Sequence, residues 1–420
     1  MDTFQDPFRL STHGSTRATA YGFSNKSVTI GDRTHVVWVD AISKVMAMTY
    51  DWNARCWSET CQIFEGADNH TTPALTVDRE KHIHVVGGPH GWWGDWNMAR
   101  FKWFRSREPN SVEEWGDETN FGYNATYACM LHMPCGLDAI AYRGGESPRS
   151  LMFQRQRKKG GWTTAREILR QDIEPQYTHN GARISCDSDG TLYIAGHFYN
   201  VGDGSNPPVT GDRLKMRSYG AAALKSEDMG RTWTDLSGNP VAVPVTYSEN
   251  IAVPPVGGDV RLAGLSMDSE GDLWALISDT SAQSQFLSLC LWNGEEWSTR
   301  DLGNAFGSDR APVYAVMTID AEDHIHIAAA AVHKTPEITR AFAHPSSEVF
   351  HVVCDQDVQD IQCCQVSIPD EKTANWMPNL SMPGPFNPVQ SPVILYTHGE
   401  KGDGCRPEME TDVYCVLPET

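Results

Sequence analysis

Short apolar runs separated by polar turns fill most of this chain, and they predict β-strands. The clearest case is the pair of apolar segments 74–77 and 83–86, which flank the polar stretch Asp78–Lys81. Runs of this length, rich in β-branched residues and joined by a tight turn, indicate an antiparallel hairpin. Residues equidistant from the turn lie opposite each other in such a hairpin. Because the turn is centred near residue 80, His70 and His90 are expected at the same open end.

The next two apolar runs have the same form. Segments 126–131 and 137–143 flank a turn at Met133-Pro134-Cys135-Gly136, centred on residue 135. Tyr127 and Arg143 are equidistant from that centre, so we expect them to pair at the open end of this second hairpin.

A strand–turn–strand unit of this kind recurs along the chain. Its turns begin near residues 31, 78, 136, 187, 268 and 320, and a less regular copy begins near Trp376. A spacing of roughly 45 to 80 residues accommodates a four-stranded propeller blade with its loops. Ser226–Trp233 also matches in full the S-x-D-x-G-x-T-W "Asp box" of sialidase-like propellers, which we interpret as a structural turn. The sequence therefore predicts an all-β protein, a seven-bladed β-propeller in which residues 1–420 form a single domain.

Composition agrees with this class and limits the partners. The chain is 40% hydrophobic and rich in glycine (35), proline (24) and tryptophan (14), while its formal net charge is -20. Such an acidic surface repels nucleic acid and anionic membranes, and no apolar run is long enough to span a bilayer. We expect a monomer.

Cysteine usage and the first residues bear on localisation. The 11 cysteines are an odd number, and Cys56 with Cys61 and Cys405 with Cys415 are the easiest local pairs in an exported protein. Residues 1–5 lack the basic and apolar regions of a signal peptide. We expect a secreted or periplasmic protein whose signal peptide is not in this sequence.

The propeller geometry turns these hairpins into one candidate site. First strands of all blades line the axis and run in the same direction, so the open ends of all first hairpins face one side. His70, His90, Tyr127 and Arg143 are then expected around one axial mouth. The same symmetry about the turns near residues 188 and 322, together with the neighbours of these residues, gives the expected substrate-binding residues: Asn69, His179, His197, Tyr199, Arg310, His333 and Lys334. Basic and aromatic groups gathered on one rim of an acidic protein indicate an acidic ligand.

The residue types at the mouth favour one reaction over others. Zinc hydrolysis would need three ligands and a carboxylate base, and neither H-E-x-x-H nor the G-x-S-x-G of a serine nucleophile is present. Glycoside hydrolysis usually needs two carboxylates, and the nearby acids are Asp68 and Asp138. β-Elimination on a uronic acid fits better, because Arg143 can neutralise the carboxylate as a C5 carbanion develops. Tyr127 or a histidine would take the C5 proton, and a second group would protonate the leaving O4.

These residues also resemble a known family. The N-H-x-x-P-A-L stretch at 69–75 with His90, followed by T-Y at 126–127 and Y-R-G at 142–144, is similar to propeller-type polysaccharide lyases with BNR-like repeats. That group includes ulvan lyases and L-rhamnose-α-1,4-D-glucuronate lyases. The resemblance implies cleavage at O4 of a glucuronate, with release of a rhamnosyl group and a 4,5-unsaturated uronate. It matches His70 and His90 to the family's paired histidines, Tyr127 to its catalytic tyrosine and Arg143 to its carboxylate-neutralising arginine.

Several alternatives stay open. We expect an exo-acting enzyme that removes terminal rhamnose from gum arabic or arabinogalactan-type glycans, because a protein of charge -20 is a poor partner for a long sulfated polyanion. An endo-acting ulvan lyase is the alternative. Outside this class, the rim could act as a non-catalytic carbohydrate-binding site. The Asp box suggests a sialidase-like hydrolase, although no arginine triad is evident.

No cofactor is expected to be required. Some relatives in the resembled group carry a structural metal, and the cluster of metal-ligand types in this sequence is His351, Cys354, Cys363 and Cys364. Its spacing is irregular, which favours disulfides or buried thiols over a metal site.

Overall fold

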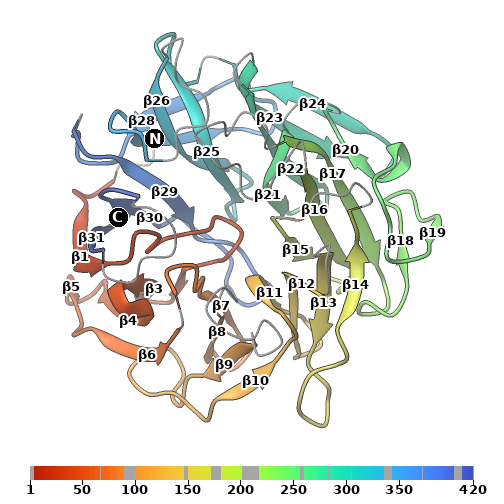
Figure 1. Ribbon diagram of the computed structural model, residues 1–420, viewed down its shortest axis with the longest axis horizontal. Coiled ribbons are helices and arrows are strands. Elements are labelled where there is room, and N and C mark those ends of the chain that lie inside the picture. Colours follow the sequence, from red (N-terminus) through yellow and green to blue (C-terminus); the bar gives the residue numbers. More distant parts are fainter. Residues whose placement is uncertain are drawn as a thin grey trace.

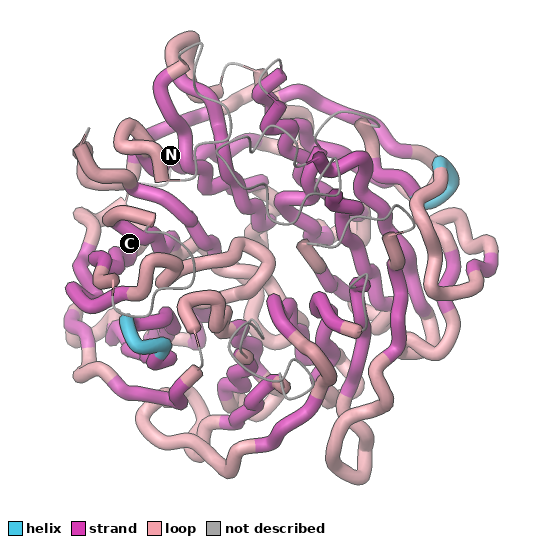
Figure 2. The backbone as a smooth tube through the Cα atoms, viewed as in Figure 1, coloured by secondary structure: helices cyan, strands magenta, loops and turns pink. Residues whose placement is uncertain are grey.

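A computed structural model shows a ring of antiparallel β-sheets arranged around a central axis (Figure 1). It describes residues 4–66, 68–88, 100–145, 150–171, 181–200, 217–255, 260–281, 284–303, 305–334, 343–370, 372–401 and 409–419. Helical structure in these ranges is confined to short turns such as η1 (Ala41–Ser43) and η4 (Glu249–Ile251), so strands dominate the tube view (Figure 2). No helix in the described ranges is both long and apolar enough to cross a membrane.

Each blade is built from consecutive antiparallel strands, with the first strand nearest the axis. Blade 1 contains β2 (Ser27–Ile30), β3 (Arg33–Asp40), β4 (Lys44–Asp51), β5 (Cys56–Trp57) and β6 (Cys61–Glu65). Blade 2 contains β7 (Ala74–Val77), β8 (Ile83–Gly87), β9 (Phe101–Arg105) and β10 (Thr119–Phe121). Blade 3 contains β11 (Thr126–His132), β12 (Asp138–Gly144), β13 (Ser150–Arg155) and β14 (Arg166–Leu169).

The later blades repeat this order. Blade 4 contains β15 (Arg183–Cys186), β16 (Leu192–Asn200), β17 (Arg217–Ser226), β18 (Trp233–Thr234), β19 (Pro240–Val241) and β20 (Ala252–Val253). Blade 5 contains β21 (Val260–Met267), β22 (Leu273–Ser281), β23 (Ser284–Trp292) and β24 (Trp297–Asp301). Blade 6 contains β25 (Arg310–Ile319), β26 (Ile325–His333), β27 (Glu348–Cys354) and β28 (Gln362–Gln365).

The two chain ends close the ring within one blade. Blade 7 has the order β29 (Asn375–Leu380), β30 (Ile394–His398), β31 (Thr411–Val416) and β1 (Phe8–Gly14), so the first strand of the chain is its outer strand. A single pairing of Gly14 with Asp40 joins this blade to blade 1 in one nine-stranded sheet. Separating the two at that pairing gives seven blades in the described part of the chain. The all-β propeller predicted from the sequence is confirmed.

The Asp box forms the turn between β17 and β18, as expected. The Asp228 carboxylate accepts hydrogen bonds from the backbone N–H groups of Arg231 and Thr232 at 2.9 and 2.8 Å. Gly230 adopts a positive φ of 81°, a conformation that favours glycine. The turn delivers Trp233, which is 2% exposed, into the core.

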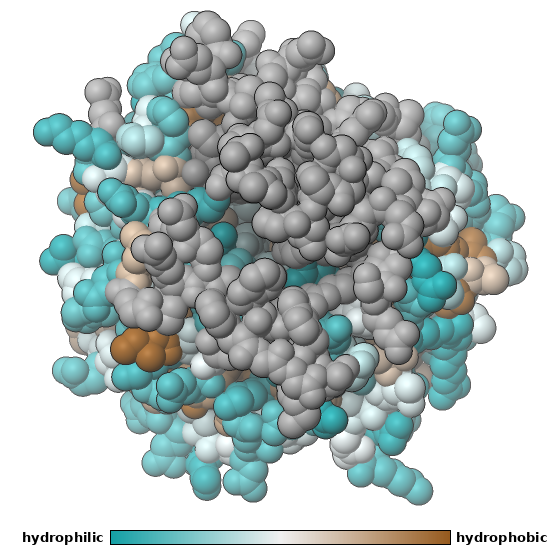
Figure 3. Space-filling view, in the orientation of Figure 1, coloured by the Kyte–Doolittle hydropathy of each residue, from teal (hydrophilic) through white to brown (hydrophobic). Residues whose placement is uncertain are grey.

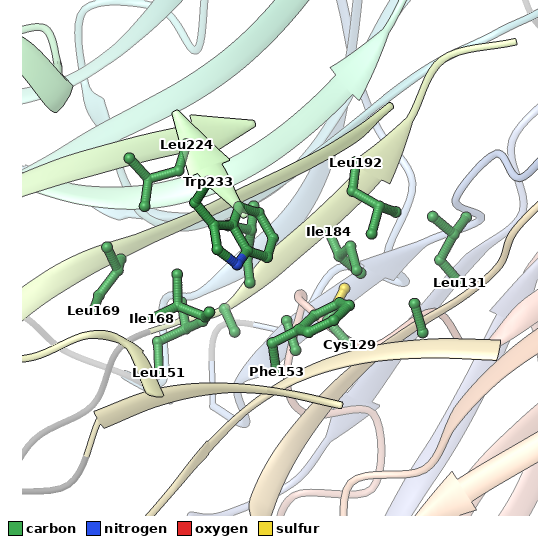
Figure 4. Packing of buried hydrophobic residues seen from close by; sticks show 14 of the residues in the cluster. Cys129, Leu131, Leu151, Phe153, Ile168, Leu169, Ile184, Leu192, Leu224 and Trp233 are labelled. Carbon is green, nitrogen blue, oxygen red and sulfur yellow. The ribbon is translucent and has the colours of Figure 1, made fainter. Parts of the chain in front are cut away.

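Apolar side chains fill the seams between neighbouring blades. Between blades 3 and 4, the ring of Phe153 packs edge-on against Trp233 with their centroids 5.5 Å apart, among leucines and isoleucines of both sheets (Figure 4). Full burial of each such side chain contributes about 1.5–3 kcal/mol. These seams hold the blades, and with them the loops at the mouth, in fixed relative positions.

Within the described ranges, the structure does not contain the local disulfide that the sequence made easiest. Cys56 and Cys61, expected as an easy local pair, are both unbonded, and Cys405 of the other expected pair lies outside the described residues. Cys56 pairs with Asp51 and Cys61 with Ala47 along β4, which separates the two thiols along the sheet.

Candidate active site

The structure brings three of the four predicted catalytic side chains together at the inner end of blades 2 and 3. The Arg143 Cζ atom lies 4.4 Å from the centroid of the Tyr127 ring, and the His70 ring centroid lies 6.4 Å from that of Tyr127. All three residues are buried, at 1% exposure for Arg143, 3% for Tyr127 and 7% for His70. The fourth, His90, lies outside the described residues. Their catalytic roles stay predictions.

The hairpin registers explain how these side chains meet. In blade 2, Ala74 pairs with Val86 and Val77 with Ile83, which is the register expected from a turn centred on residue 80. β7 begins only at Ala74, so His70 lies ahead of the strand, in the loop that follows blade 1. The His70 backbone N–H donates to Asp68 Oδ1 at 2.8 Å. That Asx-type bond fixes the direction in which the histidine leaves the loop.

The register expected for Tyr127 is wrong by one residue. Arg143 pairs with Thr126, and a bulge separates this pair from the regular pairing of Cys129 with Ala141. Tyr127 occupies the bulge with φ of 60°, a left-handed conformation that is rare for a bulky residue. The bulge re-aims the tyrosine ring over the guanidinium of Arg143. Backbone strain of this kind is concentrated at functional sites.

The prediction for blade 4 is wrong by two residues. Arg183 pairs with Ala195 and Ile184 with Ile194, so the partner of His197 in this register is Gly181 and not His179. A Cβ atom on Gly181 would overlap the His197 ring, which shows how closely the two approach. His179 and the side chain of Tyr199 lie outside the described residues.

In blade 6 the residues expected around Glu322 lie together at one end of the hairpin, although a bulge between Pro312 and Tyr314 shifts their pairing by one residue. Arg310 pairs with His333 at the inner end of β25 and β26. The Arg310 guanidinium packs 5.2 Å from the Phe350 ring centroid and donates to the backbone oxygen of Ser346 at 3.2 Å. Lys334 follows at the rim, where its backbone N–H donates to the Asp309 oxygen at 2.7 Å.

Asn69, expected to contact substrate, is fully buried. Its Nδ2 donates to Thr16 Oγ1 at 2.6 Å, which ties the loop before blade 2 to the segment before blade 1. This hydrogen bond gives the Asn69 side chain a structural role.

The pattern of apolar and polar residues did not predict that residues 15–26 would reach into the centre of the ring. In Figure 1 this red segment leaves β1 and reaches inward. Tyr21 and Phe23 pack against the Tyr127 ring with centroid separations of 5.1 and 5.6 Å, and the Gly22 N–H donates to the Tyr314 hydroxyl of blade 6. The segment therefore forms the floor on which the candidate site stands.

A buried arginine and a buried lysine beneath the mouth were also missed. Arg183, 5% exposed, lies 5.5 Å from the Phe23 ring centroid, and burial lowers its pKa to about 10. Burial likewise holds the pKa of Lys26 well below its usual value. Arg143 and Arg183 together place two guanidinium groups under a mouth whose visible centre is hydrophilic (Figure 3). Buried cations favour an anionic ligand, since an anion lowers the cost of keeping them desolvated.

The cluster His351, Cys354, Cys363 and Cys364 does not have the geometry of a metal site. His351 Nε2 lies 3.0 Å from His326 Nδ1, and Cys363 and Cys364 are successive residues of β28, which point to opposite faces. Within the described ranges, the group whose ligand atoms converge is a different one, formed by His84, His132 and Asp138 on blades 2 and 3.

Comparison with curated proteins finds ulvan lyases. The ulvan lyase of Nonlabens ulvanivorans is 26% identical over 101 residues, which are 22% of this chain and 21% of that protein. The ulvan lyase of Alteromonas sp. (strain LOR) is 22% identical over 195 residues, 43% of this chain and 39% of that protein. The matched part thus spans less than half the length of each relative.

Comparison with solved structures supports the fold over the whole chain. A PL25 ulvan lyase bound to -[GlcA(1-4)Rha3S]- has a TM-score of 0.72 at 12% identity, covering 97% of this chain and 95% of that one. The polysaccharide lyase Uly1 has a TM-score of 0.57 at 13% identity, covering 100% of both chains. At such identities the likeness concerns the fold alone.

The sequence model of one family, described as "BNR repeat-containing family member", matches residues 33–305. Those residues run from the second strand of blade 1 to the end of blade 5 and include Tyr127 and Arg143. Because this match covers well over half of the chain, the protein belongs to the BNR repeat-containing family.

Proposed function

We propose that the protein is a polysaccharide lyase that cleaves the L-rhamnose-α-1,4-D-glucuronate linkage by β-elimination. The observation that carries the proposal is the contact of a buried guanidinium, a phenol and an imidazole at one mouth: Arg143, Tyr127 and His70. The similarity to ulvan lyases supports the same class of substrate, an acidic polysaccharide of rhamnose and glucuronate.

The chemistry assigns a task to each group. The Arg143 guanidinium pairs with the C6 carboxylate and stabilises the charge that develops when C5 loses its proton. The C5–H bond breaks as the proton passes to Tyr127 or to a histidine, the C4–O4 bond breaks, and a C4=C5 double bond forms. A proton from the acid, which can be Tyr127 itself, completes the hydroxyl of the leaving rhamnose. Side chains fill all of these roles, so we propose that no cofactor takes part in the reaction.

Two substrates need to be compared. The relatives are ulvan lyases, which favours endo-cleavage of ulvan. The formal net charge of -20 favours a shorter or less sulfated glycan, such as terminal rhamnose on gum arabic removed by exo-cleavage. Both substrates occur outside cells, which agrees with the proposal of a secreted or periplasmic enzyme.

Incubation of the purified protein with ulvan and with gum arabic tests the proposal. The expected result is new ultraviolet absorbance from the C4=C5 bond conjugated to the carboxylate, lost in Tyr127→Phe. Oligosaccharides of many lengths would indicate endo-cleavage, and free rhamnose alone would indicate exo-cleavage. Binding of these glycans without new absorbance would instead identify a non-catalytic carbohydrate-binding propeller and overturn the lyase.

A further inference from the structure

Three buried side chains converge at the end of blades 2 and 3 that lies away from the mouth. His84 Nδ1 lies 2.9 Å from Asp138 Oδ1 and 2.7 Å from Oδ2, and His132 Nδ1 lies 2.6 Å from Oδ1. His84 and His132 are each 4% exposed and Asp138 is 0% exposed. We propose that this cluster binds a zinc ion, which fastens blade 2 to blade 3.

The donor set suits zinc. Two imidazole nitrogens and one carboxylate oxygen are a three-residue ligand set found at zinc sites whose fourth position is filled by water. Tetrahedral coordination with bonds of about 2.0–2.2 Å separates ligand atoms by roughly 3.3 Å. The observed nitrogen–oxygen separations of 2.6–2.9 Å are hydrogen-bond distances, and the three ligand atoms all lie within 4.8 Å of one another. An entering ion therefore has to lengthen the nitrogen–oxygen separations by roughly half an ångström. Small side-chain rotations are enough for that.

The surrounding residues orient the ligands as outer-shell partners do in metal sites. His84 Nε2 lies 3.2 Å from Asp78 Oδ2, and a carboxylate only accepts, so Nε2 carries the hydrogen and Nδ1 faces the cluster. Arg105 holds Asp78 with two bonds of 3.0 and 2.9 Å. Trp103 Nε1 donates to Asp138 Oδ2 at 2.8 Å. Such fixed carboxylate–histidine and donor–carboxylate contacts raise metal affinity.

The buried negative charge of Asp138 also requires a neighbouring cation. The Asp138 carboxylate has no exposed surface, and its ion-pairing partners among the described residues are the two imidazoles. A carboxylate in such a place needs a positive charge beside it. Either an imidazole carries an extra proton, or a metal ion lies between the three ligands. Measurement of bound zinc distinguishes the extra proton from the metal ion.

The chain contains a natural comparison on blade 6. There His326 Nε2 lies 2.9 Å from Asp320 Oδ2, while His326 Nδ1 faces His351 Nε2 at 3.0 Å. The carboxylate and His351 lie on opposite sides of one ring, so this network of two histidines and an aspartate offers no converging ligand atoms. His351→Ala is therefore the matched control.

The proposed zinc site does not rest on the proposed function. Tyr127 and His132 are five residues apart on β11, about 16 Å at the rise of a strand. Zinc there would be structural and would fix the seam across which His70 faces Tyr127 and Arg143.

The test uses the full chain without a histidine tag. After chelation and buffer exchange, Zn²⁺ alone is added, unbound metal is removed, and bound zinc is measured by plasma mass spectrometry beside the unfolding temperature. Because exposed thiols such as Cys56 and Cys135 also bind zinc, the result is the difference between the wild type and His132→Ala. We expect this difference to be one zinc per chain, with an unfolding temperature that zinc raises in the wild type and in His351→Ala but not in His132→Ala.

A Co²⁺ titration keeps the test decisive if His132→Ala folds poorly. Tetrahedral Co²⁺ gives visible absorption bands, and thiolate ligation is recognised by its separate charge-transfer bands. Bands without thiolate character in the wild type and in His351→Ala support the site. Equal zinc in wild type and His132→Ala, or no such cobalt bands in the wild type, would show that a proton on an imidazole neutralises Asp138, and the proposal would be wrong.

Discussion

Removal of the Arg143 guanidinium is the change expected to slow the proposed reaction most. The side chain is 1% exposed, and its Cζ lies 4.4 Å from the Tyr127 ring centroid, so a sugar at this tyrosine also contacts the arginine. A unit charge at about 4 Å from the guanidinium interacts with it by about 4 kcal/mol at an effective dielectric constant of about 20. The added negative charge on the substrate appears only as C5 loses its proton. Arg143→Ala should therefore lower kcat on the order of 1,000-fold, with a smaller effect on KM.

The assay follows formation of the C4=C5 double bond by ultraviolet absorbance at several substrate concentrations. Arg143→Lys keeps a charge but loses the planar pair of donors, so we expect a rate between those of the wild type and Arg143→Ala. Circular dichroism and the unfolding temperature show whether each variant is folded. Arg310→Ala is a control at the rim, since this side chain contacts the backbone of blade 6, and it should change KM more than kcat. A folded Arg143→Ala with near-normal kcat would refute the assigned role.

Three further predictions concern the site and the fold. Tyr127→Phe should keep glycan binding in calorimetry but lose at least about 100-fold in turnover, because proton transfer is removed; unchanged turnover would exclude the phenol as acid or base. Gly181→Ala places a Cβ against His197 at a φ of +44°, so the unfolding temperature should fall and KM should rise; if both stay unchanged, His197 is not held by this contact. Burial lowers the pKa of His35 to about 4, so the unfolded chain takes up a proton there first as pH falls. Stability should drop by up to about 3 kcal/mol between pH 6.5 and 4, and His35→Gln should flatten that part of the urea-unfolding profile.

Where a hairpin has a tight turn and regular strands, its register could be predicted from the sequence. The pairing of Ala74 with Val86 follows from turn position alone, because residues on the two arms stay in register when neither strand gains a residue. In blade 6 a bulge between Pro312 and Tyr314 moves the partner of Arg310 by one position, to His333. The alternation of apolar and polar positions was enough for the ring of sheets, because each blade is built mainly from neighbouring segments.

The wrong predictions have local causes that the alternation of apolar and polar residues does not reveal. In blade 4 the turn closes with the Asp187 N–H donating to the Thr191 oxygen, so its centre is residue 189 and not 188, which moves the partner of His197 by two positions. In blade 3 the bulge at Tyr127 adds a residue to one arm. Residues 15–26 show no periodic alternation of apolar and polar positions. Its place is fixed by contacts with residues more than 100 positions away, such as Ser24 Oγ with the Ala128 oxygen and Gly22 N–H with Tyr314.

The seam between blades 2 and 3 connects these observations. His70 enters the site from blade 2, whereas Tyr127 and Arg143 enter from blade 3, and catalytic groups have to be held within about 0.5 Å of their productive positions. At the mouth the inward segment bridges the seam, because the Asn25 oxygen accepts from the Leu75 N–H of blade 2 at 2.9 Å and Ser24 Oγ donates to the Ala128 oxygen of blade 3 at 2.5 Å. At the far end the buried cluster of His84, His132 and Asp138 holds the same two sheets. A seam fixed at both ends cannot tilt about either one, so the geometry of the mouth depends on buried charges about 16 Å away along β11.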